Sequence, residues 1–348
     1  VSVFATRMGW YNSIAARDLD NDGDIDYVVT NFGLNTKYKT SESSPQLLYY
    51  GDFDGTGENH LIEAKFESLP GLDKVCYPVR GLSCSSDAMP TIRDRLPTFH
   101  LFASNPLEDI YGKERLSEAL QLQCNSLESG ILINDGNAHF KFQSLPRIAQ
   151  ASPSFGVVVS DFDGDARADI YLVQNFFGPQ RETGYMDGGV SLLLNGIANT
   201  QEIQFDVVRP DQSGLVVPGD AKGLATTDLN GDGWLDFLVG VNNGRMMAFA
   251  KQPHESNHSL LVRPVGLGGN PTAAGARVTV VLDSGTSQTA EIHAGSGHLS
   301  QNTPALQFGI PAGDTVQSVE IRWPDGSSSS HKVPPDEFTT VEIHQAEP

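Results

Sequence analysis

A nine-residue acidic pattern recurs along the chain and limits its fold more than any other feature of the sequence. Its common form is Asp-x-Asp/Asn-x-Asp-Gly-x-x-Asp, and a run of apolar residues follows each copy. Three strong copies begin at Asp18, Asp161 and Asp228, and a degenerate copy begins at Asp52. An internal repeat of this kind indicates that one supersecondary unit is built several times. We call these copies loop 1 (18–26), loop 2 (161–169), loop 3 (228–236) and the degenerate loop (52–60).

Loops 1, 2 and 3 place oxygen-bearing side chains at positions 1, 3, 5 and 9, and position 7 can add its backbone carbonyl. Calcium takes six to eight oxygen ligands at about 2.3–2.6 Å, so this donor set predicts bound Ca²⁺. The residues assigned to metal binding are Asp18, Asp20, Asp22, Asp24 and Asp26 in loop 1, Asp161, Asp163, Asp165, Arg167 and Asp169 in loop 2, Asp228, Asn230, Asp232, Trp234 and Asp236 in loop 3, and Asp52, Asp54, Thr56 and Glu58 in the degenerate loop.

The pattern matches an EF-hand loop only in its first half. An EF-hand has a bidentate Glu at position 12 and flanking helices, whereas position 12 after Asp18 is Val29, inside a β-branched run. We therefore expect each loop to open into a strand. Glycine at position 6 permits the positive φ of a tight turn, and Ala166 replaces it in loop 2 with some expected strain.

An alternative interpretation is that these segments are ordinary Asp- and Gly-rich turns without metal. The shared spacing of three copies favours the metal sites over that alternative. The case is weakest for the degenerate loop, because Thr56 and His60 stand where the other copies have acids.

Short strand-like runs separated by turn residues follow the loops and predict a mainly β protein. Residues 1–251 are expected to form β-propeller blades with several antiparallel strands per acidic loop, and a helical insertion is expected at about 68–128. In that insertion, 113–123 has the spacing of an amphipathic helix. The insertion is either a decoration of the rim or a lid that binds a partner. Four loops make too few blades for a typical closed ring, so we expect a missing N-terminal propeller portion or a partner chain.

The pattern of the sequence changes near residue 252, where the acidic loops end and a new series of strand-like runs begins. Strand-like runs at 260–265, 276–282, 289–293 and 319–323 predict a small β-sandwich or barrel domain over 252–348.

Several of these motifs resemble known families. The acidic loops are similar to FG-GAP/VCBS repeats, the calcium-loop propeller repeats also found in integrin α-subunits. Four segments, 275–280, 295–301, 308–309 and 319–326, resemble the ASPIC/UnbV domain. This pairing occurs in the cartilage acidic protein family, and segments 48–55 and 220–223 resemble its bacterial branch. The resemblance implies calcium binding, an extracellular or periplasmic location and an interaction role, and it supplies no catalytic residue.

The charge of the chain limits its partners. With 23 Lys and Arg against 43 Asp and Glu, the net charge is −20, which repels nucleic acid. No run of about 18 apolar residues occurs, so the sequence predicts no membrane span. The leading hypothesis is a secreted calcium-binding scaffold that binds a protein or a glycan.

The alternative function is an extracellular enzyme that acts on glycans. A glycosidase needs two carboxyl groups about 5–10 Å apart, and nothing in the sequence brings such a pair together outside the loops. Cys76 and Cys84 are close enough in sequence to form a disulfide, which would leave Cys124 unpaired; the alternative is three free thiols.

Overall fold

The computed structural model describes residues 6–68, 74–137, 139–180, 183–197, 203–334 and 339–347. These residues divide into two compact units. Unit 1 contains residues 6–10 and 37–127, and unit 2 contains residues 11–36 and 128–347. The main part of unit 1, residues 37–127, is therefore inserted into the chain of unit 2, and residues 6–10 precede that chain.

The limits of the two units differ from the domain limits drawn on the sequence. The segment 68–128 falls almost wholly within unit 1, which begins earlier, at residue 37, and also holds the degenerate loop. Position 252 falls inside unit 2, whose C-terminal strands belong to the same compact body as loops 1, 2 and 3.

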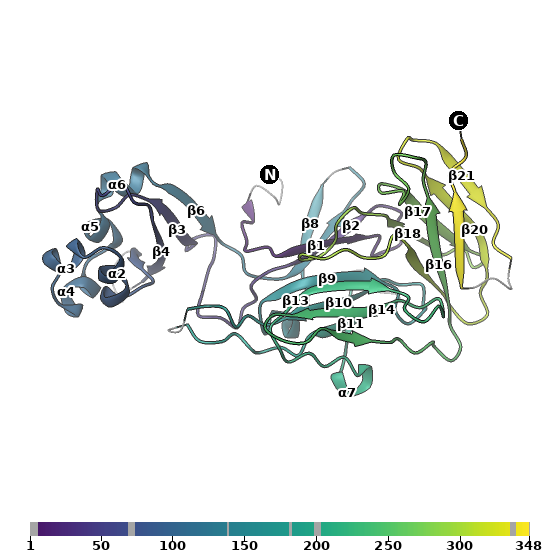
Figure 1. Cartoon of the computed structure of the whole chain (residues 1–348), viewed down its shortest axis with the longest axis horizontal. Helices are drawn as coiled ribbons and strands as arrows, with labels where there is room; N and C mark the ends of the chain where they lie inside the picture. The colour runs from purple at the N-terminus through teal and green to yellow at the C-terminus, as the bar shows by residue number, and fades with distance from the viewer. Residues whose placement is uncertain are drawn as a thin grey trace. The chain divides into compact units, whose positions relative to one another are not determined.

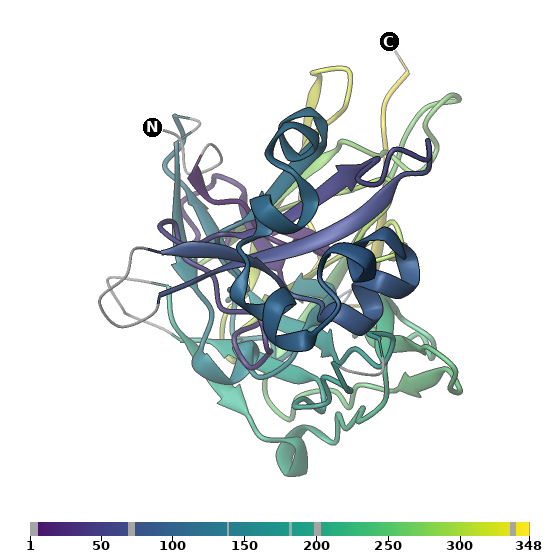
Figure 2. The same ribbon diagram turned by 90° about the vertical axis from the view of Figure 1, so that its left-hand side faces the viewer.

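Unit 1 is an antiparallel sheet with short helices on one face (Figure 2). Its strands, in the order β5-β4-β3-β6, are β3 (Gln46–Gly51), β4 (His60–Glu67), β5 (Val75–Pro78) and β6 (Leu120–Cys124). Its described helices are α2 (Leu82–Ala88), α3 (Thr91–Arg95), α4 (Phe99–Ser104), α5 (Leu107–Tyr111) and α6 (Lys113–Glu118). Strand alternation turns Leu47 and Tyr49 of β3 towards these helices, where they share one core with Ile110 and Tyr111.

The helix expected over 113–123 is wrong in its second half. Helix α6 ends at Glu118, and Leu120 and Leu122 lie in β6, opposite Tyr50 and Leu48 of β3. Residues 120–124 pair with the edge of the sheet in spite of their helical periodicity. The spacing of apolar residues within this segment cannot show that its strand partner lies about 70 residues earlier in the chain.

In unit 2, three antiparallel sheets each contain one acidic loop. The first, ordered β1-β2-β7-β8, consists of β1 (Ser13–Arg17), β2 (Asp26–Thr30), β7 (Gly130–Asn134) and β8 (Phe140–Ser144). The second, ordered β12-β11-β10-β9, consists of β9 (Ser154–Ser160), β10 (Asp169–Gln174), β11 (Leu192–Gly196) and β12 (Phe205–Val208). The third consists of β13 (Ala221–Thr227), β14 (Asp236–Val241) and β15 (Met247–Phe249). The connections include η1 (Arg147–Gln150) and α7 (Pro210–Ser213).

Each acidic loop joins the first strand of its sheet to the second. Loop 1 joins β1 to β2, loop 2 joins β9 to β10, and loop 3 joins β13 to β14. The aspartate at position 9 is in each case the first residue of the second strand. The prediction that the loops open into strands is confirmed.

The first strands of the three sheets lie side by side, with β9 between β1 and β13 (Figure 1). One apolar core fills the space between the first two sheets, and another fills the space between the second and third. Strand β10 is consequently buried along its whole length, which explains its nearly unbroken apolar sequence. Within the described residues the sheets stay separate and form no closed ring. The mainly β class is confirmed, and the propeller stays a prediction.

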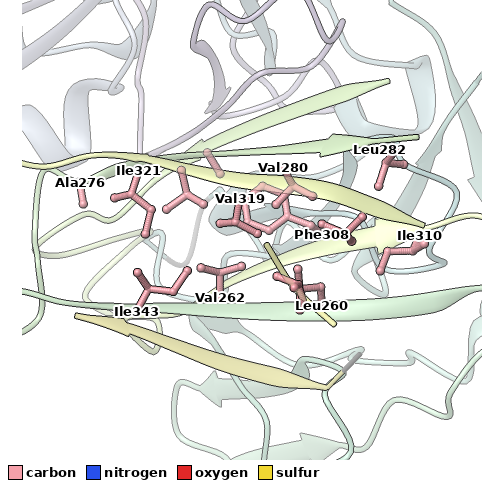
Figure 3. Close-up of a cluster of buried hydrophobic side chains, with 14 of the residues drawn as sticks. Leu260, Val262, Ala276, Val280, Leu282, Phe308, Ile310, Val319, Ile321 and Ile343 are labelled. Carbon is pink, nitrogen blue, oxygen red and sulfur yellow. The ribbon is translucent and has the colours of Figure 1, made fainter. Parts of the chain in front are cut away.

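The C-terminal strands form a sandwich of two sheets around one core (Figure 3). One sheet, ordered β19-β16-β22, contains β16 (His258–Val265), β19 (Leu306–Ile310) and β22 (Thr340–His344). The other, ordered β18-β17-β20-β21, contains β17 (Arg277–Leu282), β18 (Ser287–Glu291), β20 (Val316–Arg322) and β21 (Ser328–His331). Leu260, Val280, Phe308 and Val319 are fully buried between the sheets. Burial of each such side chain stabilises the fold by about 1.5–3 kcal/mol.

Cys76, Cys84 and Cys124 are free thiols in this structure, which agrees with the second of the two cysteine alternatives. Burial raises the pKa of Cys76 to about 11, so this thiol stays protonated at neutral pH. In the described part of the chain, none of the helices has both the length and the apolar composition needed to cross a membrane.

Candidate metal-binding loops

Two residues in each loop have a positive φ angle. At position 6 these are Gly23 (93°), Ala166 (68°) and Gly233 (84°), and at position 4 they are Asn21 (61°), Gly164 (80°) and Gly231 (77°). The sequence pattern predicts the positive φ at position 6 but not the one at position 4. Loops 2 and 3 have glycine at position 4, whereas loop 1 has Asn21 there, so the pattern does not show a shared glycine. Ala166 is strained as expected, because this conformation costs an L-residue about 1–2 kcal/mol. Its methyl group packs into the core of the sandwich.

The carboxylate at position 1 holds each loop closed from within. Asp18 accepts hydrogen bonds from the N–H groups of Asp22 (3.2 Å) and Gly23 (3.0 Å). Loops 2 and 3 repeat this arrangement at 2.7–3.2 Å, with Asp161 and Asp228 as the acceptors. The sequence pattern therefore specifies one backbone conformation three times.

Position 7 contributes an N–H group to this framework. The N–H groups of Asp24, Arg167 and Trp234 donate to the position 5 carboxylates over 2.8, 2.9 and 2.9 Å. The side chain of Asp24 lies against Gly136, in the turn between β7 and β8. The backbone carbonyl is thus the donor that position 7 can offer to a metal in loop 1.

The aspartate at position 9 fastens each loop to a neighbouring segment. Both oxygens of Asp26 accept hydrogen bonds, one from the N–H of Leu19 (2.9 Å) and one from that of Asn134 (2.8 Å). Asp169 and Asp236 bond in the same way to position 2 of their own loops and to Gly196 or Lys251. This structural role accounts for the complete burial of position 9 and is not evident from the sequence.

The carboxylates at positions 1, 3 and 5 converge in loops 1 and 2. In each of these clusters, one oxygen from every carboxylate lies within 4.8 Å of the others. The clusters are Asp18, Asp20 and Asp22 in loop 1, and Asp161, Asp163 and Asp165 in loop 2. Three hard oxygen donors at this spacing suit Ca²⁺ or Mg²⁺.

The electrostatics of these two clusters favours a cation. Burial, together with the charges of Asp20 and Asp22, raises the pKa of Asp18 to about 6. Burial, together with Asp165 and Asp163, raises the pKa of Asp161 to about 7. Neighbouring carboxylates disfavour each other's ionisation, and a divalent cation among them stabilises their ionised forms. The residues present therefore fit a metal.

Loop 3 has the same backbone with one carboxylate fewer. Asn230 occupies position 3, and its Nδ2 donates to Oδ2 of Asp232 over 2.9 Å. An amide supplies a neutral carbonyl oxygen in place of a carboxylate, which lowers the charge repulsion and also weakens the attraction for a cation.

The degenerate loop, in unit 1, has Thr56 and His60 at the positions where the other copies have acids. The Thr56 hydroxyl donates to Asp54 (2.7 Å), and Nε2 of His60 lies 3.7 Å from Oδ2 of Asp54. The N–H of Gly57, which bonds to Asp52, lowers the pKa of that carboxyl. With fewer acids to repel one another, this loop has less need of a cation than loops 1 and 2.

A buried arginine that the pattern does not predict lies beside loops 1 and 2. The guanidinium of Arg17, the last residue of β1, donates to the Gln307 carbonyl (2.9 Å) and lies 5.2 Å from the centre of the Phe308 ring. Burial lowers the pKa of Arg17, and the charges of Asp161, Asp18 and Asp169 oppose that shift. Arg17 supplies a fixed positive charge for these acids. In the sequence, the only indication of this role is that Arg17 directly precedes Asp18 at the end of a strand-like segment.

Comparison with known proteins supports part of the resemblance stated above. The family model described as ASPIC and UnbV matches residues 266–348. Cartilage acidic protein 1 of Homo sapiens is 28% identical over 307 residues, which is 86% of this chain and 40% of that protein. The Xenopus tropicalis protein of the same name is 24% identical over 320 residues, 90% of this chain and 43% of that protein. The Mus musculus protein is 28% identical over 212 residues, 59% of this chain and 31% of that protein.

The chain spans less than half the length of these curated relatives. Residues 266–348, which include strands β17 to β22, thus match the ASPIC and UnbV family, and the chain is similar to cartilage acidic protein 1 over most of its length.

Proposed function

We propose that this chain is a calcium-stabilised interaction module, with structural Ca²⁺ in loops 1, 2 and 3. The observation that carries the proposal is the repeated loop conformation, in which the carboxylates of positions 1, 3 and 5 converge in loops 1 and 2. Each loop fills its coordination sphere from its own residues, so the metal has a structural role. Binding to the folded state alone stabilises that state.

We further propose that the three loop-bearing sheets are FG-GAP/VCBS-like blades of a larger β-propeller. Their support is the common strand–loop–strand order and the neighbouring positions of β1, β9 and β13. Membership of a bacterial branch rests only on the sequence resemblance.

The proposed setting is extracellular or periplasmic. Extracellular calcium modules bind at about 10⁻⁴–10⁻³ M, which suits partly exposed loops such as loop 3. The similarity to cartilage acidic protein 1 supports this setting, because cartilage consists mainly of extracellular matrix.

The partner in this proposal is a protein or a glycan, and binding is favoured over catalysis. A pocket of about 450 Å³ in unit 1 has a single carboxylate in its lining, Glu108. A smaller pocket of about 190 Å³ in unit 2 also has one, Glu291. Neither pocket presents the pair that glycoside hydrolysis requires.

Calorimetric titration with Ca²⁺ after dialysis against chelator tests the proposal. We expect saturable binding at two or three sites and a higher melting temperature in calcium. Anomalous scattering at crystals grown in calcium would then locate ions at the loops. Absence of binding at millimolar Ca²⁺ would refute the metal sites.

A further inference from the structure

We infer that the C-terminal sandwich holds loops 1, 2 and 3 in their metal-binding shape and that Gln307 is the positioning residue. This inference rests on the calcium sites proposed above. It assigns the sandwich a task in metal binding although none of the proposed ligands lies in it.

Gln307 contacts all three loops or their immediate neighbours. It lies in β19 and is 1% exposed. Its Nε2 donates to the carbonyl of Asp161 (2.8 Å), and its Oε1 accepts from the N–H of Leu235 (3.1 Å). Its own carbonyl accepts from Arg17, next to Asp18. One buried residue thus joins position 1 of loop 2, position 8 of loop 3 and the entrance to loop 1.

Each loop also has a second contact with the sandwich. Ser259 Oγ donates to the carbonyl of Gly233 in loop 3 over 2.8 Å, and Asn257 Nδ2 donates to the carbonyl of Asp163 in loop 2 over 3.0 Å. In loop 1, the guanidinium of Arg277 donates to the carbonyl of Gly23.

These contacts share one chemistry. Apart from the N–H groups of Leu235 and Asp18, which donate to Gln307 and to the carbonyl of Thr289, the sandwich bonds to loop carbonyls, and none of these bonds uses a carboxylate at position 1, 3 or 5. Those carboxylates accept from N–H groups of their own loop, and Asp163 also accepts from Nδ2 of Asn195 in β11 (2.6 Å). The backbone is fixed from outside and the carboxylates are left for a cation. Because converging carboxylates repel each other, a loop without this support would open before metal arrives. A preorganised site binds more tightly since the ordering cost is already met.

Linkage makes the effect reciprocal: if the sandwich raises the affinity of the loops for calcium, calcium must stabilise the docking of the sandwich by the same factor.

The test compares calcium affinities of full-chain variants by calorimetry after chelator dialysis. Gln307→Ala removes the bonds to Asp161 and Leu235, and we expect its average affinity for Ca²⁺ to fall about fivefold or more. Ser329→Ala is the matched control. It removes the acceptor of Trp323 Nε1 (3.0 Å) within the sandwich and touches no loop. We expect it to lower the melting temperature in chelator and to leave calcium affinity unchanged.

Two milder variants decide the matter if Gln307→Ala does not fold. Ser259→Ala should weaken one site, that of loop 3, and Asn257→Ala should weaken that of loop 2, each with the other sites unchanged. If the wild type binds calcium and the folded variants bind it with the same affinities, the proposed role of the sandwich is wrong. No calcium binding by the wild type would instead overturn the proposed function, and the inference with it, before any variant is compared.

Discussion

The carboxylate of Asp161 lies directly against the α-carbon of Gly309. A Cβ atom added at Gly309 would stand 1.9 Å from Oδ2 of Asp161, far inside contact distance. Gly309 lies within β19 and is not among the residues with positive φ. It is therefore close approach, not backbone conformation, that requires glycine here.

Gly309→Ala should displace loop 2 and destabilise the protein. Overpacking of a tight contact costs about 1–3 kcal/mol, and here the group displaced is a proposed ligand of calcium. Urea unfolding curves with and without Ca²⁺ measure both effects. Gly268→Ala is the control, since a Cβ there meets nothing within 4 Å. Equal losses in the two variants would show that the contact has no energetic weight.

Replacement of Asp20 and Asp22 by Asn should lower the melting temperature in calcium and change little in chelator. In chelator the substitution removes two charges that repel Asp18, and an amide oxygen at position 22 can still accept from the N–H of Asp24, so the variant should be as stable as the wild type or slightly more so. Glu320→Gln, which removes one exposed carboxylate from β20, is the control for a loss of charge away from the loops. A similar shift of the double variant in both conditions would show that loop 1 binds no metal.

In chelator, the stability of the protein should decrease as the pH rises from about 4 to about 7. Asp18 and Asp165 have pKa values raised to about 6, and Asp161 to about 7, from the ordinary value of 3.8. A raised pKa means that the folded state holds the proton more tightly than the unfolded state does. The protonated carboxyl therefore stabilises the fold fully below the unfolded-state pKa, and this stabilisation is lost as the pH rises through the folded-state pKa. Calcium should flatten or reverse this trend, because it binds the ionised carboxylates. Thermal melts across this pH range, with and without Ca²⁺, measure the slopes. A chelated protein that gains stability over the range contradicts the raised pKa values.

Asp236→Ala should destabilise the protein whether or not calcium is present. It leaves the N–H groups of Leu229 and Lys251 without their acceptor, each now bonded over 2.8 Å. A buried group left unsatisfied costs about 1–3 kcal/mol, so the free energy of unfolding should fall by about 2–4 kcal/mol in both conditions. A loss confined to calcium would assign Asp236 to the metal and not to the framework.

Much of the local structure was predictable from the sequence. Each loop wraps around its own first aspartate and leads into its own strand, so nine consecutive residues supply many of the hydrogen bonds that give the loop its backbone conformation. The sandwich was predictable for a similar reason, because alternation in segments such as 276–282 reports one buried face.

The features that escaped prediction all depend on distant partners. Arg17 is buried because Gln307 and Phe308 approach it from residues nearly 300 positions away. The parallel pairing of β16 with β22 likewise has no local signature. The degenerate loop looks like the other copies, yet it joins β3 to β4 in an inserted sheet, since a hairpin pattern does not state which sheet it belongs to.

Asn31 holds together the two points where the chain leaves unit 2 for unit 1 and returns. Its N–H donates to Ser129 Oγ (2.9 Å) and its Nδ2 to the carbonyl of Glu128 (3.3 Å), so the outgoing and incoming segments lie side by side. A module grafted at this point needs only adjacent ends to leave the β2–β7 pairing intact. An insertion of another size or sequence at this site can therefore be accommodated while loops 1, 2 and 3 keep the strands that they join.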